Sequence, residues 1–319
     1  MRLIYFGSGD FGLPTLQALV EADHEVAAVV TQPDRPAGRK RLPTPTPIAA
    51  WARDQGLDVW KQENVNEPDF VARVAALRAE ASVVIAFGQK LSPPLIEAMG
   101  RLAVNLHASL LPAYRGAAPI HWAMIDGQTT TGVSVIGLAQ KMDAGPIYAT
   151  DSLKIDPSET AGELHDRLAQ AGPAAVGRVL EQLREGRLEP KVQDESAATA
   201  ARKFKKTDGT VDFSQTAEQV RARVHGLTPW PGCRVVWRSG HSGTQQTLTL
   251  KRVVDHPADE GPATGRPLAG VVTPDLRIAC GQGSVELREL QLPGGKPLSF
   301  EQFQRGHPLR RGDTLSPLS

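Results

Sequence analysis

Short apolar segments alternate with amphipathic segments over most of the chain. Continuous apolar runs predict buried strands, over residues 2–6, 25–31, 81–87 and 102–106. Apolar residues spaced three and four apart predict helices between the strands, over residues 14–22, 48–55, 68–78 and 93–99. Strands that alternate with helices form right-handed βαβ units. The pattern therefore predicts an α/β fold with a Rossmann-like, mostly parallel sheet.

The same pattern continues to about residue 186 and then changes. Further elements are expected, namely a helix over 120–126, strands over 132–138 and 147–155, and a helix over 161–183 interrupted near Gly172 and Pro173. Small polar residues then predict a linker over 189–207 between a catalytic domain, 1–188, and a second domain, 208–319. In the second domain, short strands separated by Gly and Pro turns predict a small, OB-like antiparallel β-barrel.

Composition adds the class of protein to this picture. A chain of 319 residues with 40% hydrophobic and 22% charged residues is typical of a globular protein with two domains. No apolar run approaches the roughly 18 residues that span a bilayer, and the first residues do not resemble a signal peptide. Cys233 and Cys280 have no metal-binding spacing. We therefore expect a cytoplasmic protein with reduced cysteines and no membrane contact.

Charge is unevenly distributed along the chain. Residues 1–200 carry 19 Lys and Arg against 24 Asp and Glu, a net charge of −5, whereas residues 201–319 carry 17 against 11, a net charge of +6. Basic residues also gather in a proline-rich loop over 34–47 and in the run RKFKK over 202–206. These features indicate either contacts with a polyanion or solvated surface charge, and charge alone leaves both open.

Polar residues follow the apolar strand over 102–106. Asn105 and His107 are two residues apart, so on a strand they share a face, and Pro112 ends any strand before it. Asp143 lies among small residues after a later strand. In an open α/β sheet, ligands bind at the carboxyl ends of the strands. These positions therefore predict a ligand crevice, and none of them has metal-ligand spacing.

The chemistry of these three residues fits acyl transfer. An Asn amide can donate to an oxyanion, a neutral His can take up and return a proton, and a nearby carboxylate can orient the imidazole. No covalent enzyme intermediate is needed, and Ser109 lacks the glycine-flanked elbow of a serine nucleophile. The residues by themselves leave open a plainer interpretation, with a capping Asn, a core His and a loop Asp.

The segment GSGDFG, residues 7–12, matches the glycine pattern of a dinucleotide-binding turn. The acidic residue expected at the end of the second strand is absent, because Thr31 and Gln32 occupy that place. We favour a tight strand-to-helix turn that requires small residues over a nucleotide site.

Several motifs together resemble the formyltransferase family that uses 10-formyl-tetrahydrofolate as formyl donor. They are NLHASLLPAYRGAAPIHWAMIDGQTTTGVSV, KMDAGPI, FGSGDFG, TQPDRPAGR and TPWPG, and they extend the likeness over essentially the whole chain. The resemblance implies an initiator methionyl-tRNA as the acceptor, whose amino group attacks the formyl carbon. It implies that Asn105 stabilises the oxyanion, that His107 handles protons, and that Asp143 tunes His107 and helps protonate the departing folate nitrogen.

The same resemblance implies the remaining site residues and partners. The implied folate-binding residues are Ser109, Leu110, Leu111, Pro112, Phe87, Gly88, Gln89 and Leu91. The implied tRNA-binding residues are Arg35, Arg39, Lys40, Arg41, Lys203, Lys205 and Lys206. We expect a monomer that binds neither metal nor NAD. The alternatives are a formyltransferase acting on a sugar-nucleotide amine or on glycinamide ribonucleotide, an NAD(P)-dependent dehydrogenase and a non-catalytic RNA-binding protein.

Overall fold

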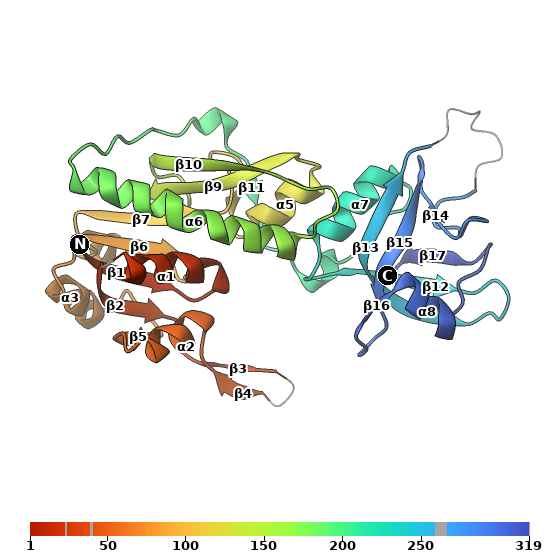
Figure 1. Ribbon diagram of the computed structural model, residues 1–319, viewed down its shortest axis with the longest axis horizontal. Helices are drawn as coiled ribbons and strands as arrows, with labels where there is room; N and C mark the ends of the chain where they lie inside the picture. Colours follow the sequence, from red (N-terminus) through yellow and green to blue (C-terminus); the bar gives the residue numbers. More distant parts are fainter. Residues whose placement is uncertain (23, 39–40, 259–266, 319) are drawn as a thin grey trace. The chain divides into compact units, whose positions relative to one another are not determined.

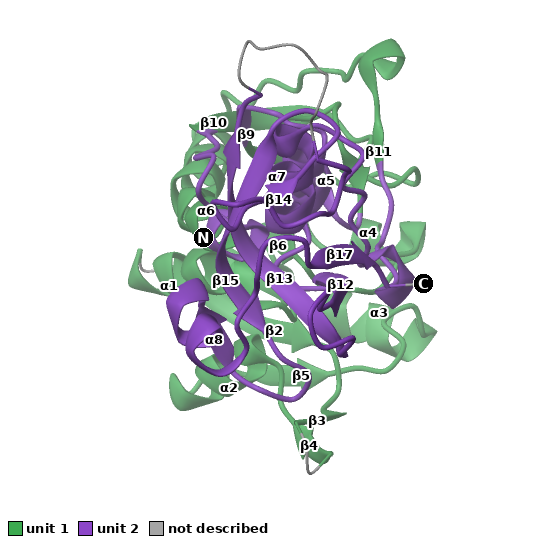
Figure 2. Cartoon of the chain, turned by 90° about the vertical axis from the view of Figure 1, so that its right-hand side faces the viewer, with its two compact units in different colours: residues 1–116, 132–153, 165–200 green, residues 117–131, 154–164, 201–319 purple. Residues whose placement is uncertain are grey.

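The computed structural model describes residues 1–22, 24–38, 41–258 and 267–318. The chain forms two compact units, coloured separately in Figure 2. Unit 1 comprises residues 1–116, 132–153 and 165–200, and unit 2 comprises residues 117–131, 154–164 and 201–319. These units interleave along the chain, whereas the expected division into 1–188 and 208–319 is contiguous and stays a prediction. Within the described ranges, every helix is too short or too polar to span a bilayer.

Unit 1 is built on a seven-stranded sheet in the order β10-β9-β7-β6-β1-β2-β5. The strands are β1 (Arg2–Gly7), β2 (Glu25–Thr31), β5 (Val59–Lys61), β6 (Ala81–Ile85), β7 (Leu102–His107), β9 (Thr130–Gly137) and β10 (Ile147–Lys154). Strands β1, β2, β5, β6 and β7 are parallel, and β9 is antiparallel to β7. The predicted Rossmann-like, mostly parallel sheet is confirmed. The carboxyl ends of β1, β2, β6 and β7 share one edge of the sheet.

The helices of this part of the chain mostly begin at a proline. They are α1 (Leu13–Glu21), α2 (Pro47–Asp54), α3 (Pro68–Ala76), α4 (Pro93–Ala98), α5 (Pro119–Ile125) and α6 (Ala161–Arg184). Proline suits the first turn of a helix because that turn's N–H groups have no intrahelical partner. In Figure 1, α1 and α6 lie across one face of the sheet.

The expected break in α6 is absent, and the helix runs on through Pro173. A side chain at Gly172 would place its Cβ 2.5 Å from Thr15 Oγ1 and 2.7 Å from a Leu106 methyl carbon. The glycine therefore lets α6 pack closely on α1 and β7. This packing offsets the hydrogen bond that Pro173 cannot donate.

The expected proline-rich basic loop over 34–47 contains a short two-stranded hairpin. Strands β3 (Arg35–Ala37) and β4 (Leu42–Thr44) form an antiparallel hairpin that projects from the sheet in Figure 1. Pro36 pairs with Pro43. Since neither proline has an N–H, they occupy a pair position that needs no hydrogen bond. Arg39 and Lys40, which the resemblance implied as tRNA-binding residues, lie outside the described residues.

Unit 2 contains the predicted antiparallel barrel, with more elements than the sequence indicated. Its strands are β12 (Cys233–Arg238), β13 (Gln245–His256), β14 (Ile278–Ala279), β15 (Ser284–Gln291), β16 (Pro297–Ser299) and β17 (Thr314–Pro317), and its helices include α7 (Ala217–Gly226) and α8 (Phe300–Gly306). The order is β14-β15-β13-β12-β17, with β16 on β15. Isolated bridges from Val271 to Thr314 and from Val272 to Ile278 nearly close the barrel.

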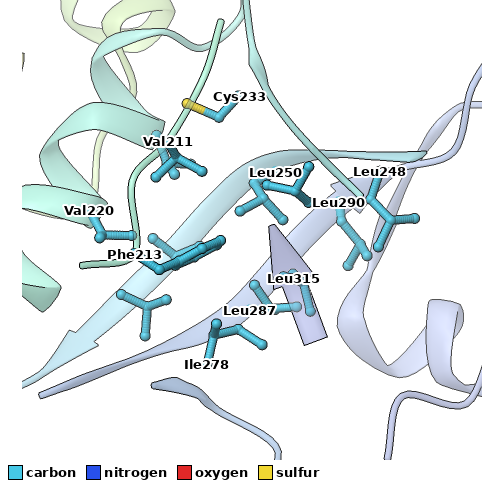
Figure 3. Close-up of a cluster of buried hydrophobic side chains, with 14 of the residues drawn as sticks. Val211, Phe213, Val220, Cys233, Leu248, Leu250, Ile278, Leu287, Leu290 and Leu315 are labelled. Carbon is cyan, nitrogen blue, oxygen red and sulfur yellow. The ribbon is translucent and has the colours of Figure 1, made fainter. Parts of the chain in front are cut away.

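Apolar side chains fill the barrel, and they come from its strands and from the segment that precedes α7. Figure 3 shows Phe213 and Val211 meeting Leu250, Leu290 and other strand residues. Cys233 lies at this core, and burial raises the pKa of its thiol to about 12. The thiol is therefore protonated and unreactive at neutral pH.

Candidate active site

Strand β7 positions the two residues that begin the candidate site. Asn105 pairs with Val84 on β6 and with Ile136 on β9, so the strand is held on both sides. The Asn105 side chain is half-buried and makes no hydrogen bond to any residue that the structure describes. Its amide is therefore available to a ligand, and it fits a donor for the oxygen of a formyl group.

His107 ends β7 and is 6% exposed. Its Nε2 lies 2.9 Å from the backbone oxygen of Tyr114, and its Nδ1 lies 3.7 Å from Asp143 Oδ2. A carbonyl oxygen can only accept, so Nε2 carries the proton. Nδ1 is then the nitrogen that can take up a proton, and the imidazolium so formed would face a carboxylate.

Asp143 reaches the site from the loop between β9 and β10. Its φ of 54° lies in the left-handed region that few residues other than glycine adopt. The N–H of Gly116 donates to Asp143 Oδ2 over 2.8 Å. The structure thus brings two of the three expected catalytic residues, His107 and Asp143, into direct contact, and leaves the Asn105 amide open on the same strand.

The predicted folate-binding segment after β7 is a tightly bonded turn. Ser109 is fully buried, and its hydroxyl donates to the Ala113 carbonyl over 2.7 Å. The Leu111 N–H donates to Ser134 Oγ, which in turn donates to the Ser109 carbonyl. The peptide bond between Leu111 and Pro112 is cis. These bonds commit the Ser109 hydroxyl to the fold, whereas Leu110 and Pro112 are half-buried.

The second predicted folate-binding segment follows β6. Phe87 is buried against Phe6, whereas Gly88 is exposed and has a φ of 85°. Gln89 accepts from the Val65 N–H and donates to the Gln62 carbonyl, so its amide holds a neighbouring loop. Leu91 is half-buried beside the unit 1 core. The Gln89 amide oxygen and one of its N–H groups are therefore committed to the fold.

The glycine turn after β1 is explained by packing. A Cβ on Gly12 would lie 2.1 Å from the Tyr5 hydroxyl oxygen, and a Cβ on Gly7 would lie 2.5 Å from a Tyr5 ring carbon. Tyr5 is fully buried and donates to the Gly12 carbonyl over 2.9 Å. The small residues are required by this tyrosine, which supports the tight-turn interpretation over a dinucleotide site.

The predicted tRNA-binding residues lie on exposed segments. Arg35 is exposed and pairs with Glu63 over 2.8 Å, and Arg41 is exposed in the hairpin. Lys203, Lys205 and Lys206 are exposed in unit 2. Their neighbour Arg202 instead makes two 2.9 Å hydrogen bonds to Asp208. Arg202 is thus committed to the fold, while the three lysines project into solvent.

Sequence reasoning missed a polar group that supports the site. Arg115 is 8% exposed, and it donates to Gln193 and to Glu195, each at 2.7 Å. Lys141 also pairs with Glu195. Hydrogen bonds from Arg115 and Lys141 lower the pKa of the Glu195 carboxyl to about 2. Arg115 belongs to the sequence motif around Pro112 and could have been considered for the site. Gln193 and Glu195 lie in the expected linker, whose composition gave no reason to single them out.

Comparison with known families agrees with this architecture. Residues 1–180 match the model of the formyl transferase family, and residues 203–308 match that of the formyl transferase C-terminal domain. The methionyl-tRNA formyltransferase of Geobacter metallireducens is 38% identical over 317 residues, covering 99% of this chain and 98% of that protein. That of Cereibacter sphaeroides is 38% identical over 312 residues, covering 98% of each.

Solved structures show the fold at lower identity. An N-formyltransferase from Helicobacter canadensis, in complex with folinic acid and dTDP-3-aminofucose, has a TM-score of 0.66 at 13% identity and covers 90% of this chain and 99% of that one. HypX from Aquifex aeolicus, in complex with tetrahydrofolic acid, has a TM-score of 0.60 at 16% identity and covers 99% of this chain and 50% of that one.

Proposed function

Because this chain belongs to the methionyl-tRNA formyltransferase family, we propose that it transfers the formyl group of 10-formyl-tetrahydrofolate to the amino group of initiator methionyl-tRNA, giving N-formylmethionyl-tRNA for translation initiation. Among the structural features, the contact of His107 Nδ1 with Asp143 carries the proposal. It is joined by the amide of Asn105 on the same strand as His107, which makes no hydrogen bond to the described residues. The sugar-nucleotide alternative is less supported, since the N-formyltransferase from Helicobacter canadensis shares 13% identity with this chain, whereas the methionyl-tRNA formyltransferases of Geobacter metallireducens and Cereibacter sphaeroides share 38%.

Each catalytic residue has a task set by its geometry. The Asn105 amide donates to the formyl oxygen as negative charge develops on it, a contact worth about 3 kcal/mol in comparable sites. His107 takes the proton of the attacking amine at Nδ1, because Nε2 is held by the Tyr114 carbonyl. Asp143 stabilises the resulting imidazolium. The proton then passes to the departing folate nitrogen as the bond from that nitrogen to the formyl carbon breaks.

The donor lies, in this proposal, between the turn that follows β7 and the segment that follows β6. Leu110, Leu111 and Pro112 line one side, with Ser109 holding the turn. Backbone groups of Phe87, Gly88, Gln89 and Leu91 form the other side. Asn105 fits a formyl-bearing ligand because its amide is open, and the chemistry needs neither metal nor NAD.

The acceptor tRNA is held by exposed basic residues. The hairpin residues Arg35 and Arg41, together with Arg39 and Lys40, contact phosphates near the acceptor end, and Lys203, Lys205 and Lys206 of unit 2 contact further phosphates. Such contacts add affinity without reading sequence. We further propose that the chain works as a monomer in the cytoplasm, where its two buried cysteines stay reduced.

Formyl transfer to charged initiator tRNA, with a sugar-nucleotide amine as a competing acceptor, tests the proposal. We expect transfer to the tRNA alone. Transfer to the sugar alone would contradict the proposed acceptor, and no transfer to either would contradict the proposed reaction.

His107→Ala should lower kcat at least about 100-fold, the low end of general acid–base loss, and leave folate binding nearly unchanged. Wild-type turnover in this variant would remove His107 from the mechanism.

Salt dependence tests the phosphate contacts separately. Replacing Lys203, Lys205 and Lys206 by Ala should weaken tRNA binding and reduce the slope of log affinity against log salt by up to about three. Arg202→Ala is the matched control in the same basic run, because its guanidinium is already paired with Asp208. An unchanged slope in the triple variant would show that these lysines do not contact phosphate.

A further inference from the structure

One side chain of the expected linker is bonded to the loop that carries Asp143. Gln193 is 7% exposed. Its Nε2 donates to the backbone oxygens of Asp143 and Gly145 over 2.8 and 2.7 Å. Its Oε1 accepts from Arg115 Nε at 3.1 Å and from Arg115 Nη2 at 2.7 Å. Both N–H groups and the carbonyl oxygen of this amide are therefore used.

The loop around Asp143 needs such a partner because its backbone is constrained. Asp143 has a left-handed φ. Two residues later, the backbone of Gly145 passes so close to β9 that a Cβ at this glycine would lie 1.8 Å from the Gly137 carbonyl oxygen. The carbonyl groups of Asp143 and Gly145, two residues apart, both accept from the side-chain amide of Gln193. Without Gln193 the partly buried Asp143 carbonyl and the buried Gly145 carbonyl would lose this donor, and the loop could relax toward ordinary backbone angles.

The segment that carries Gln193 is itself anchored on both sides. Ile147 and Lys191 exchange two backbone hydrogen bonds of 2.8 Å, which fix the segment to the start of β10. Thr199 accepts from the Tyr114 N–H at its side chain and from the Arg115 N–H at its backbone, each over 2.8 Å. The segment over 191–199 thus binds β10, the strand after the Asp143 loop, and Tyr114, whose carbonyl oxygen contacts His107.

We propose that Gln193 is a positioning residue that holds Asp143 where its carboxylate faces His107 Nδ1. The inference rests on the proposed function, which assigns Asp143 to catalysis. Gln193 acts through the backbone of the loop and touches no reacting atom. Its amide is required because it donates to two carbonyl oxygens and accepts from Arg115 at once, which neither an apolar nor an acidic side chain of the same size can do.

Two replacements of Gln193 separate positioning from general stability. Gln193→Met keeps the volume but removes every polar contact. Gln193→Glu keeps an acceptor for Arg115 but places a carboxylate against two carbonyl oxygens, so it removes only the contacts to the Asp143 loop. We expect both to lower kcat for formyl transfer about 10- to 100-fold, with the KM for methionyl-tRNA changed less than about threefold. Gln170→Met, on the exposed side of α6, is the matched control and should behave as wild type.

The same replacements are then made in Asp143→Asn. If Gln193 acts through Asp143, they should lower kcat less than about threefold in that background, because the interaction they position is already lost. A wild-type kcat in Gln193→Glu, or equal losses in both backgrounds, would overturn the positioning role. If Asp143→Asn alone retains wild-type turnover, the catalytic assignment of Asp143 fails, and the positioning role of Gln193 fails with it. If the wild-type chain transfers no formyl group to methionyl-tRNA, the proposed function itself fails, so the two failures are distinguishable.

Discussion

Replacing Asp143 by Asn removes the charge opposite His107 and little else. The Asn side chain has a similar size, can still accept from the Gly116 N–H, and tolerates the left-handed φ of 54°. At the 3.7 Å that separates Nδ1 from Oδ2, a full ion pair is worth about 4 kcal/mol at an effective dielectric of about 20, and about 1 kcal/mol in bulk water. The His107 and Asp143 side chains are 7% and 15% exposed, which places the pair nearer the first value.

The expected result is a kcat lowered about 100- to 1000-fold, since the imidazolium forms only as the amine is deprotonated. The KM for methionyl-tRNA should change little, because the charge acts in the transition state. The assay is steady-state formyl transfer at saturating donor, with Asp54→Asn, an exposed carboxylate on α2, as control. A kcat within about threefold of wild type, or a raised KM with kcat intact, would refute the assignment of Asp143 to proton handling.

Two further predictions concern stability. Gly12→Ala should destabilise the protein by about 1 to 3 kcal/mol in denaturant titrations, because the new Cβ meets the Tyr5 hydroxyl, and Tyr5→Phe in the same chain should recover part of the loss; unchanged stability would refute the packing explanation of the turn. Burial lowers the pKa of His225, which accepts from the Val253 N–H, to about 4. Between pH 7 and pH 4 the unfolded chain therefore binds a proton that the folded chain does not, and the free energy of unfolding falls by up to about 3 kcal/mol. His225→Gln should reduce that fall, and an identical pH dependence in the variant would contradict it.

Periodicity predicted the elements that depend on local pattern. The strands β1, β2, β6 and β7 and the helices between them were expected because each buries an apolar run or stripe that the sequence displays directly. The elements that were missed are short or exposed. Strand β17 and the hairpin of β3 and β4 have few apolar residues, and their pairing depends on partners far along the chain or across a tight turn.

The continuity of α6 shows a second limit of local reasoning. Gly172 and Pro173 disfavour a helix by themselves, and the sequence therefore predicted an interruption. The helix continues because Gly172 allows contact with Thr15 and Leu106, which lie far away in sequence. A contact of this kind has no signature in the residues near the proline.

By itself, the sequence determined the class of fold, the strand that ends in the candidate site, and the residue types Asn105, His107 and Asp143 that suit acyl transfer. Local pattern is sufficient for the strand and for Asn105 and His107, which are two residues apart, whereas Asp143 was singled out by the separate motif KMDAGPI. Only the tertiary structure brought His107 Nδ1 to 3.7 Å from Asp143 Oδ2. Only the tertiary structure placed the Gln193 amide within hydrogen-bond distance of the carbonyl oxygens of the Asp143 loop. Hydrogen bonds between residues some 50 positions apart depend on chain packing, and composition classed that glutamine as part of a linker.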